Sequence, residues 1–110
     1  HTEELENIDL PASLTKGKPD VYALRVKGVS MIDAFIADGD LVLLEPIPQP
    51  ENGDMVAAWL TDRDEVTLKR FYLEGATVRL EPANTTMEPI ILPAENVAVR
   101  GRVVGVVRTL

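Results

Sequence analysis

The chain has 110 residues, of which 45% are hydrophobic and 26% are charged, a composition typical of one small globular domain. It contains no cysteine and a single histidine, His1. We therefore expect no disulfide, no metal site, no cofactor and no serine–histidine–aspartate triad. No apolar run approaches the length that spans a membrane, and residues 1–9 lack the apolar core of a signal peptide.

The formal net charge of −7 is concentrated in the first half of the chain. Residues 1–55 carry four basic and eleven acidic side chains, whereas residues 56–110 carry seven of each. Binding to a nucleic-acid backbone requires Lys and Arg side chains that displace counterions. We therefore expect no direct DNA binding by these residues.

Residues 1–20, which contain turn-forming Pro and Gly, are expected to be an arm that leads into a domain over residues 21–110. Apolar residues that alternate or run together between turn signals predict strands. These cover residues 21–27, 40–45, 55–60, 65–72, 76–81, 90–92 and 97–108. Apolar residues at helical spacing in Ser30–Ile36 predict a helix of about two turns. The expected fold is mainly β, a small barrel or sandwich of about seven short strands with one short helix.

The last predicted strand is rich in valine and contains Gly101 and Gly105. Glycine inside a strand indicates a bulge, a sharp bend or a close backbone approach. As an edge strand, this segment would present unpaired backbone groups to a second copy. We therefore expect a homodimer formed through about Val99–Val107.

Ser30 and Lys69 are the candidate catalytic pair, although each also has an ordinary structural explanation. Ser30 and Asp33 at the start of the predicted helix are spaced as in a capping box. A strand lysine such as Lys69 usually points to water. Neither residue alone therefore indicates catalysis.

Together the two residues would make a coherent catalytic pair. A serine at the start of a helix lies beside backbone N–H groups that can stabilise an oxyanion. A lysine can lose its proton and act as a base when its apolar strand neighbours, here Val66, Leu68 and Phe71, shield it from water. Thr67 lies two residues before Lys69, so it shares a face of the strand and its hydroxyl is placed to orient the amine.

The segment LRVKGVSMIDAFIADGDLVLLE (24–45) closely resembles the nucleophile region of the LexA family of self-cleaving repressors. The remaining blocks of that family are resembled in the same order, by ENGDMVAAWL (51–60), DEVTLKRF (64–71), VRLEPANTTMEPI (78–90) and VRGRVVGVVR (99–108). The resemblance covers nearly all of residues 10–110. Its serine and lysine boxes, 39 residues apart, are specific when they occur together.

The resemblance implies that Ser30 is the nucleophile of a serine endopeptidase and Lys69 its general base. The backbone amides of Val29 and Ser30 would then form the oxyanion hole. Family members cut a hinge Ala-Gly or Cys-Gly bond, and neither dipeptide occurs in these residues. We therefore expect this chain to be the catalytic part of a longer protein.

The resemblance also implies a cellular role and partners. A RecA–ssDNA filament would stimulate the cleavage, which relieves repression of DNA-damage (SOS) genes in the bacterial cytoplasm. The DNA would be bound through an N-terminal helix-turn-helix domain that is absent from these residues.

Two other functions remain open from the sequence. A UmuD-like mutagenesis protein shares the same serine and lysine boxes. A non-catalytic β-barrel interaction domain would use Ser30 and Lys69 only structurally. A separation of about 2.6–3.2 Å between Lys69 Nζ and Ser30 Oγ would favour a cleaving domain.

Overall fold

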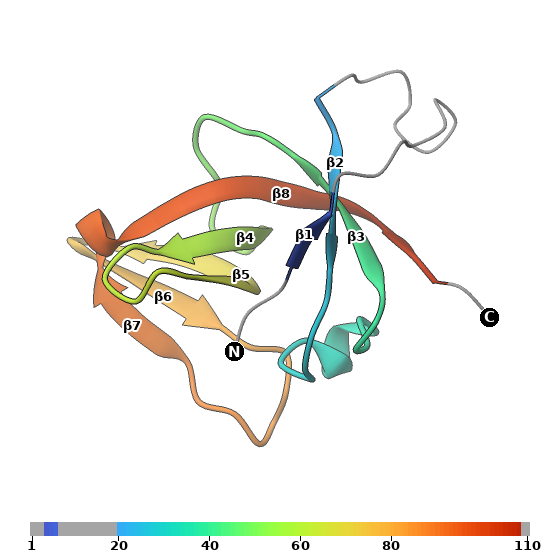
Figure 1. Ribbon diagram of the computed structural model, residues 1–110. Coiled ribbons are helices and arrows are strands. Elements are labelled where there is room, and N and C mark those ends of the chain that lie inside the picture. Colours follow the sequence, from blue (N-terminus) through green and yellow to red (C-terminus); the bar gives the residue numbers. More distant parts are fainter. Residues whose placement is uncertain (1–3, 7–19, 109–110) are drawn as a thin grey trace.

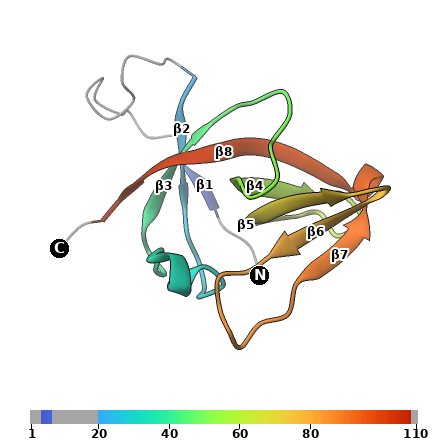
Figure 2. The same cartoon turned by 180° about the vertical axis from the view of Figure 1, so that it is seen from behind.

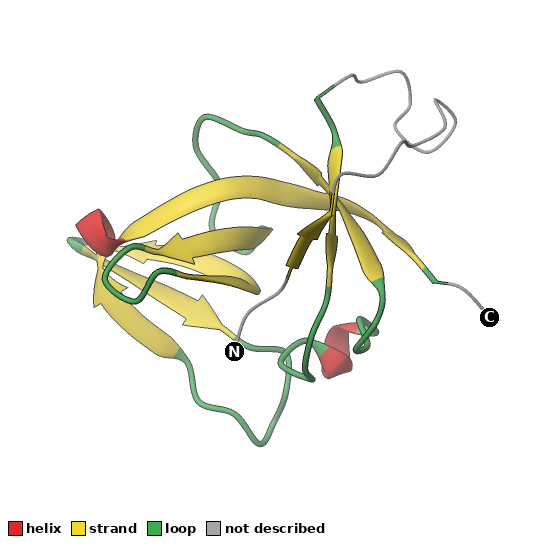
Figure 3. Ribbon diagram, viewed as in Figure 1, coloured by secondary structure: helices red, strands yellow, loops and turns green. Residues whose placement is uncertain are grey.

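A computed structural model describes residues 4–6 and 20–108 of the chain. These residues form eight β-strands and two single-turn 3-10 helices (Figures 1 and 3). In chain order the elements are β1 (Glu4–Glu6), β2 (Tyr22–Arg25), η1 (Ile32–Ala34), β3 (Leu41–Glu45), β4 (Met55–Leu60), β5 (Glu65–Glu74), β6 (Thr77–Glu81), β7 (Ile90–Pro93), η2 (Ala94–Asn96) and β8 (Val97–Val107). The mainly β prediction is confirmed. The seven expected strands correspond to β2–β8, with bounds within one or two residues of those expected, whereas β1 was not predicted.

The arm predicted over residues 1–20 lies largely outside the described residues. In its described part, β1 pairs antiparallel with β2. No helix in the described ranges is long and apolar enough to cross a membrane.

The eight strands form one antiparallel sheet in the order β1-β2-β3-β8-β4-β5-β6-β7. Strand β8 pairs with β4 through its first half and with β3 through its second half. Figures 1 and 2 show β8 curving across the molecule, with β1–β3 on one side and β4–β7 on the other. The sheet begins at β1 and ends at β7, so the pairings of the described strands leave it open and bent rather than closed into a barrel.

The bend creates two hydrophobic cores that β4 and β5 share. Side chains alternate along a strand, so neighbouring residues of β4 enter different cores. The first core contains Leu24, Val26, Met31, Ile36, Val42, Leu44, Ala57 and Leu68. The second contains Val56, Ala58, Leu60, Phe71, Val78, Leu80 and Leu92. The middle of β5 is therefore covered on both faces, and its polar residues Thr67 and Lys69 are buried there.

The expectation that the last strand is a sheet edge is wrong, because β8 lies between β3 and β4. Two register shifts leave Arg100 and Val104 without a partner in the neighbouring strand, and such bulges bend a strand. Gly101 and Gly105 follow these two residues, and a Cβ atom on either would closely meet a side chain of β2 or β3. The interpretation of the glycines as marks of bulges and close approach is confirmed.

The predicted two-turn helix is also wrong, since η1 is a single 3-10 turn. Phe35 ends it by adopting a left-handed backbone conformation with φ of 62°. Ser30 is not a cap, because the N-cap residue is Met31 and no side chain caps the turn. The nucleophile candidate thus lies in the tight turn before η1 and not at the N-cap position that was expected.

Candidate active site

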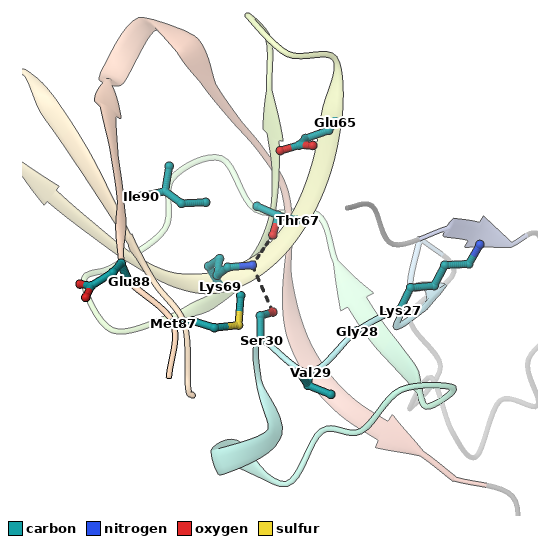
Figure 4. Close-up of a pocket in the computed structure, with 10 residues that line it drawn as sticks. All are labelled: Lys27, Gly28, Val29, Ser30, Glu65, Thr67, Lys69, Met87, Glu88 and Ile90. Carbon is teal, nitrogen blue, oxygen red and sulfur yellow. Dashed lines mark hydrogen bonds between the residues drawn. The ribbon is translucent and has the colours of Figure 1, made fainter. Parts of the chain in front are cut away.

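The two sides of the bent sheet bring Ser30 and Lys69 together. Ser30 lies in the turn between β2 and η1, whereas Lys69 lies on β5. Lys69 Nζ lies 3.1 Å from Ser30 Oγ (Figure 4). This separation is within hydrogen-bond reach, the geometry that proton transfer between the two groups requires.

Thr67 lies beside Lys69 on the same face of β5. Lys69 Nζ donates a hydrogen bond to Thr67 Oγ1, and the two side chains are only 5% and 4% exposed. The amine thus lies within hydrogen-bond reach of both the threonine hydroxyl and the serine hydroxyl (Figure 4).

The residues that shield Lys69 differ in part from those expected. Leu68 packs into the first core, on the opposite face of β5 from Lys69. Met87 and Ile90, which follow β6 in the chain, line the cavity beside the lysine instead (Figure 4). They come from a distant part of the sequence, and for that reason the strand pattern around Lys69 does not reveal them.

A cavity of about 270 Å³ adjoins the serine and the lysine. Its size admits a short stretch of extended peptide. The side chains of Lys27 and Glu88 lie at its rim and point away from the lysine amine (Figure 4). The lining residues are Lys27, Gly28, Val29, Ser30, Glu65, Thr67, Lys69, Met87, Glu88 and Ile90.

Val29 and Ser30, two of the residues that line this cavity, each carry a backbone N–H that donates to no described group. The Val29 side chain is 50% exposed. The preceding N–H, of Gly28, donates instead to Asp38 Oδ1 at 2.8 Å. The turn therefore leaves two adjacent donors available to a bound group.

The loop between β6 and β7 holds this turn from the other side. Asp33 N–H donates to the Ala83 carbonyl at 2.7 Å, and Thr85 N–H donates to Asp33 Oδ2 at 3.1 Å. Asn84 Nδ2 donates to the Val29 carbonyl at 2.8 Å. Asp33 thus connects the turn to a loop that is distant in sequence, and it is not the helix cap expected from its spacing. Asn84 was missed, because the loop carries no periodic pattern that relates it to Ser30.

Residues 1–104 match the peptidase family described as Peptidase S24-like. The chain belongs to this family. It is 65% identical over 91 residues to the LexA repressor of Herpetosiphon aurantiacus, a match that covers 83% of this chain and 42% of the relative. It is 51% identical to the LexA repressor of Roseiflexus sp., over 99% of this chain and 51% of the relative. It is 44% identical to the LexA repressor of Koribacter versatilis, over 96% of this chain and 52% of the relative.

The chain spans about half the length of the curated relatives it matches. These matches confirm the recognition of a LexA-type C-terminal domain, which was based on the serine and lysine boxes.

A second polar contact of this S24-like domain ties β8 to the turn before β3. Asp40, only 3% exposed, accepts hydrogen bonds from the Arg108 guanidinium at 2.7 and 2.9 Å and from the Ala37 N–H at 2.8 Å. The hydrogen bond from Arg108 lowers the pKa of the Asp40 carboxyl. Within the described residues, no group of histidine and carboxylate side chains is arranged to hold a metal ion.

Proposed function

We propose that the chain is the self-cleaving serine–lysine endopeptidase domain of a LexA-like transcriptional repressor of the SOS response. The observation that carries the proposal is the 3.1 Å separation of Lys69 Nζ and Ser30 Oγ beside a peptide-sized cavity. Membership of a peptidase family and the names of the relatives support it. In this proposal Ser30 is the nucleophile, Lys69 is the general base, and Thr67 orients the lysine amine.

The reaction requires Lys69 in its neutral form. Its lone pair takes the Ser30 hydroxyl proton as Oγ attacks the scissile carbonyl carbon. The N–H groups of Val29 and Ser30 stabilise the oxyanion that forms. When the C–N bond breaks, the Lys69 ammonium returns the proton to the leaving amine. Water, deprotonated by Lys69, then hydrolyses the acyl-enzyme and regenerates the serine.

The proposed substrate is a hinge Ala-Gly or Cys-Gly bond of the same protein, N-terminal to these residues. Residues 1–20 would be the arm after the hinge, and residues 21–110 the catalytic and dimerisation domain. A RecA–ssDNA filament is the proposed activator. An N-terminal helix-turn-helix domain would bind the operator, so the cut separates DNA binding from this domain.

A homodimer is also part of the proposal. Val104 and Val106 are exposed near the C-terminal end of β8, and such apolar side chains favour contact with a second copy. Sedimentation of this chain at tens of micromolar would test it, and a monomer at that concentration would count against it.

The test of the function uses the full-length parent protein at alkaline pH, with and without a RecA–ssDNA filament. Ser30→Ala and Lys69→Ala should each abolish cleavage of the hinge, followed by gel, whereas the exposed-turn control Arg63→Ala should cleave normally. Cleavage at the normal rate by a folded Ser30→Ala protein would favour the non-catalytic interaction domain. A parent that cleaves but does not bind operator DNA would favour the UmuD-like alternative.

A further inference from the structure

Asn84 holds the backbone carbonyl that directly precedes the nucleophile. The Val29 carbonyl oxygen accepts hydrogen bonds from Asn84 Nδ2 at 2.8 Å and from Ile32 N–H at 3.2 Å. This carbonyl and the N–H of Ser30 are the two ends of one peptide unit. Because a trans peptide is planar, its N–H points opposite to its C=O. A side chain that fixes the carbonyl therefore fixes the direction of the Ser30 N–H.

The Asn84 amide is itself held in one orientation. Its Oδ1 accepts hydrogen bonds from Thr86 N–H at 2.9 Å and from Thr86 Oγ1 at 2.6 Å. An amide whose oxygen receives two donors must turn its NH₂ group the other way, which is toward Val29. The donor to the Val29 carbonyl is thus in place before any substrate binds.

We infer that Asn84 is a positioning residue for cleavage, which aims and polarises the Val29–Ser30 peptide so that the Ser30 N–H binds the oxyanion. A hydrogen bond to a peptide carbonyl strengthens the donor at the other end of the same unit. The inference rests on the proposed function. Removal of the Asn84 amide leaves the two hydrogen bonds that Asp33 makes with the loop, one through its backbone N–H and one through its carboxylate, so the β6–β7 loop stays attached to the turn.

The test measures how fast a fluorophosphonate labels Ser30 in this chain, which requires no hinge substrate. Ser30 Oγ attacks phosphorus, fluoride leaves, and Lys69 takes the hydroxyl proton. The labelling rate should rise with pH to a plateau as Lys69 becomes neutral. Asn84→Ala should lower that plateau about tenfold, less than the loss of a whole oxyanion donor, and leave the pH midpoint unchanged. Thr86→Val, which loosens Asn84 but keeps its NH₂ group, should lower the plateau about two- to threefold.

The matched control is Asn52→Ala, which also removes a side-chain amide. The Oδ1 of Asn52 accepts the Leu73 N–H at 2.8 Å, and neither residue lines the cavity. Asn52→Ala should lower the melting temperature and leave the labelling rate unchanged.

Three results would overturn the inference. The first is a folded Asn84→Ala protein whose plateau labelling rate equals that of the wild type. The second is an Asn84→Ala protein whose labelling is slower only because the pH midpoint has shifted. The third is an Asn52→Ala protein whose plateau rate falls as much as that of Asn84→Ala. If Asn84→Ala does not fold, a plateau labelling rate in Thr86→Val equal to that of the wild type would overturn the inference instead. Labelling that is absent from the wild-type chain, or equally fast in Ser30→Ala, would instead overturn the proposed function.

Discussion

In the proposed mechanism, Thr67 positions the Lys69 amine and affects how readily that amine loses its proton. A hydroxyl oxygen that accepts from Nζ stabilises the ammonium more than the neutral amine. Thr67→Val removes that acceptor, so the midpoint of the rate–pH profile should move to lower pH. The plateau should fall about tenfold, because the amine is no longer aimed at Ser30.

Hinge cleavage of the parent protein, followed across pH values from neutral to alkaline, measures both quantities. Thr77→Val is the control, since Thr77 Oγ1 donates only to the Glu74 carbonyl in a surface turn. A midpoint that stays in place or rises in Thr67→Val would contradict this role.

At the scale of single residues, the sequence predicted what local pattern and family boxes can reveal. The boxes pointed to Ser30 and Lys69, and the two-residue period of a strand placed Thr67 beside the lysine. Asn84 and Met87 were not predictable, because the path of an irregular loop depends on the strands it joins. Asp33 was misread, since a partner 52 residues away displaced the local capping contact.

At the scale of elements, alternation and turn residues predicted the strands well because both signals are local. Their order in the sheet was a different matter. The valine-rich composition of β8 suits an edge and a central strand alike, and only tertiary packing places it between β3 and β4. The helix prediction failed because the chain leaves the helical conformation at Phe35, whose backbone is left-handed. Met31 and Ile36 are nevertheless both buried, so their apolar spacing reflects packing into the core and not a helix.

The close approach at Gly101 predicts unequal effects of two alanine substitutions in β8. A Cβ atom at Gly101 would lie 2.9 Å from Tyr22 Oη and 3.1 Å from the Glu45 carbonyl oxygen. The Glu45 carbonyl belongs to the backbone of a paired strand and cannot move aside without distorting the sheet. Gly101→Ala should therefore lower the free energy of unfolding by about 2–3 kcal/mol.

Gly105→Ala is the matched comparison, because its Cβ would meet Leu43 Cδ1 at 3.3 Å, the end of a rotatable side chain. We expect a loss of about 1 kcal/mol or less there. Urea unfolding of both variants measures the difference, and equal losses would show that the contact at Gly101 is not tight.

At the scale of the whole molecule, the Asp40–Arg108 contact makes the stability of the fold depend on pH in the acid range. The Asp40 pKa is lowered in the folded chain, whereas an unfolded aspartate titrates near about 3.9. The stabilisation is therefore fully present above about pH 4 and is lost as pH falls through the lower, folded-state value.

Asp40→Asn keeps an acceptor for the Ala37 N–H and removes the charge. Its melting temperature should lie below that of the wild type at neutral pH, and the gap should narrow below about pH 4. The exposed Asp62→Asn variant should show no such gap. A difference for Asp40→Asn that stays constant down to about pH 2 would rule out this origin.

The position of β8 in the sheet has a consequence for the order of events during synthesis. Ser30 belongs to the side of the molecule built from β1–β3, and Lys69 to the side built from β4–β7. Among the described strands, β8 alone hydrogen-bonds to both sides. Translation makes β8 after the other seven described strands, so a growing chain holds Ser30 and Lys69 before it holds the strand that joins the two sides. Pairing between segments so distant in sequence also forms slowly. If the chain cleaves itself as proposed, the direction of translation delays assembly of the serine–lysine pair until β8 has been made.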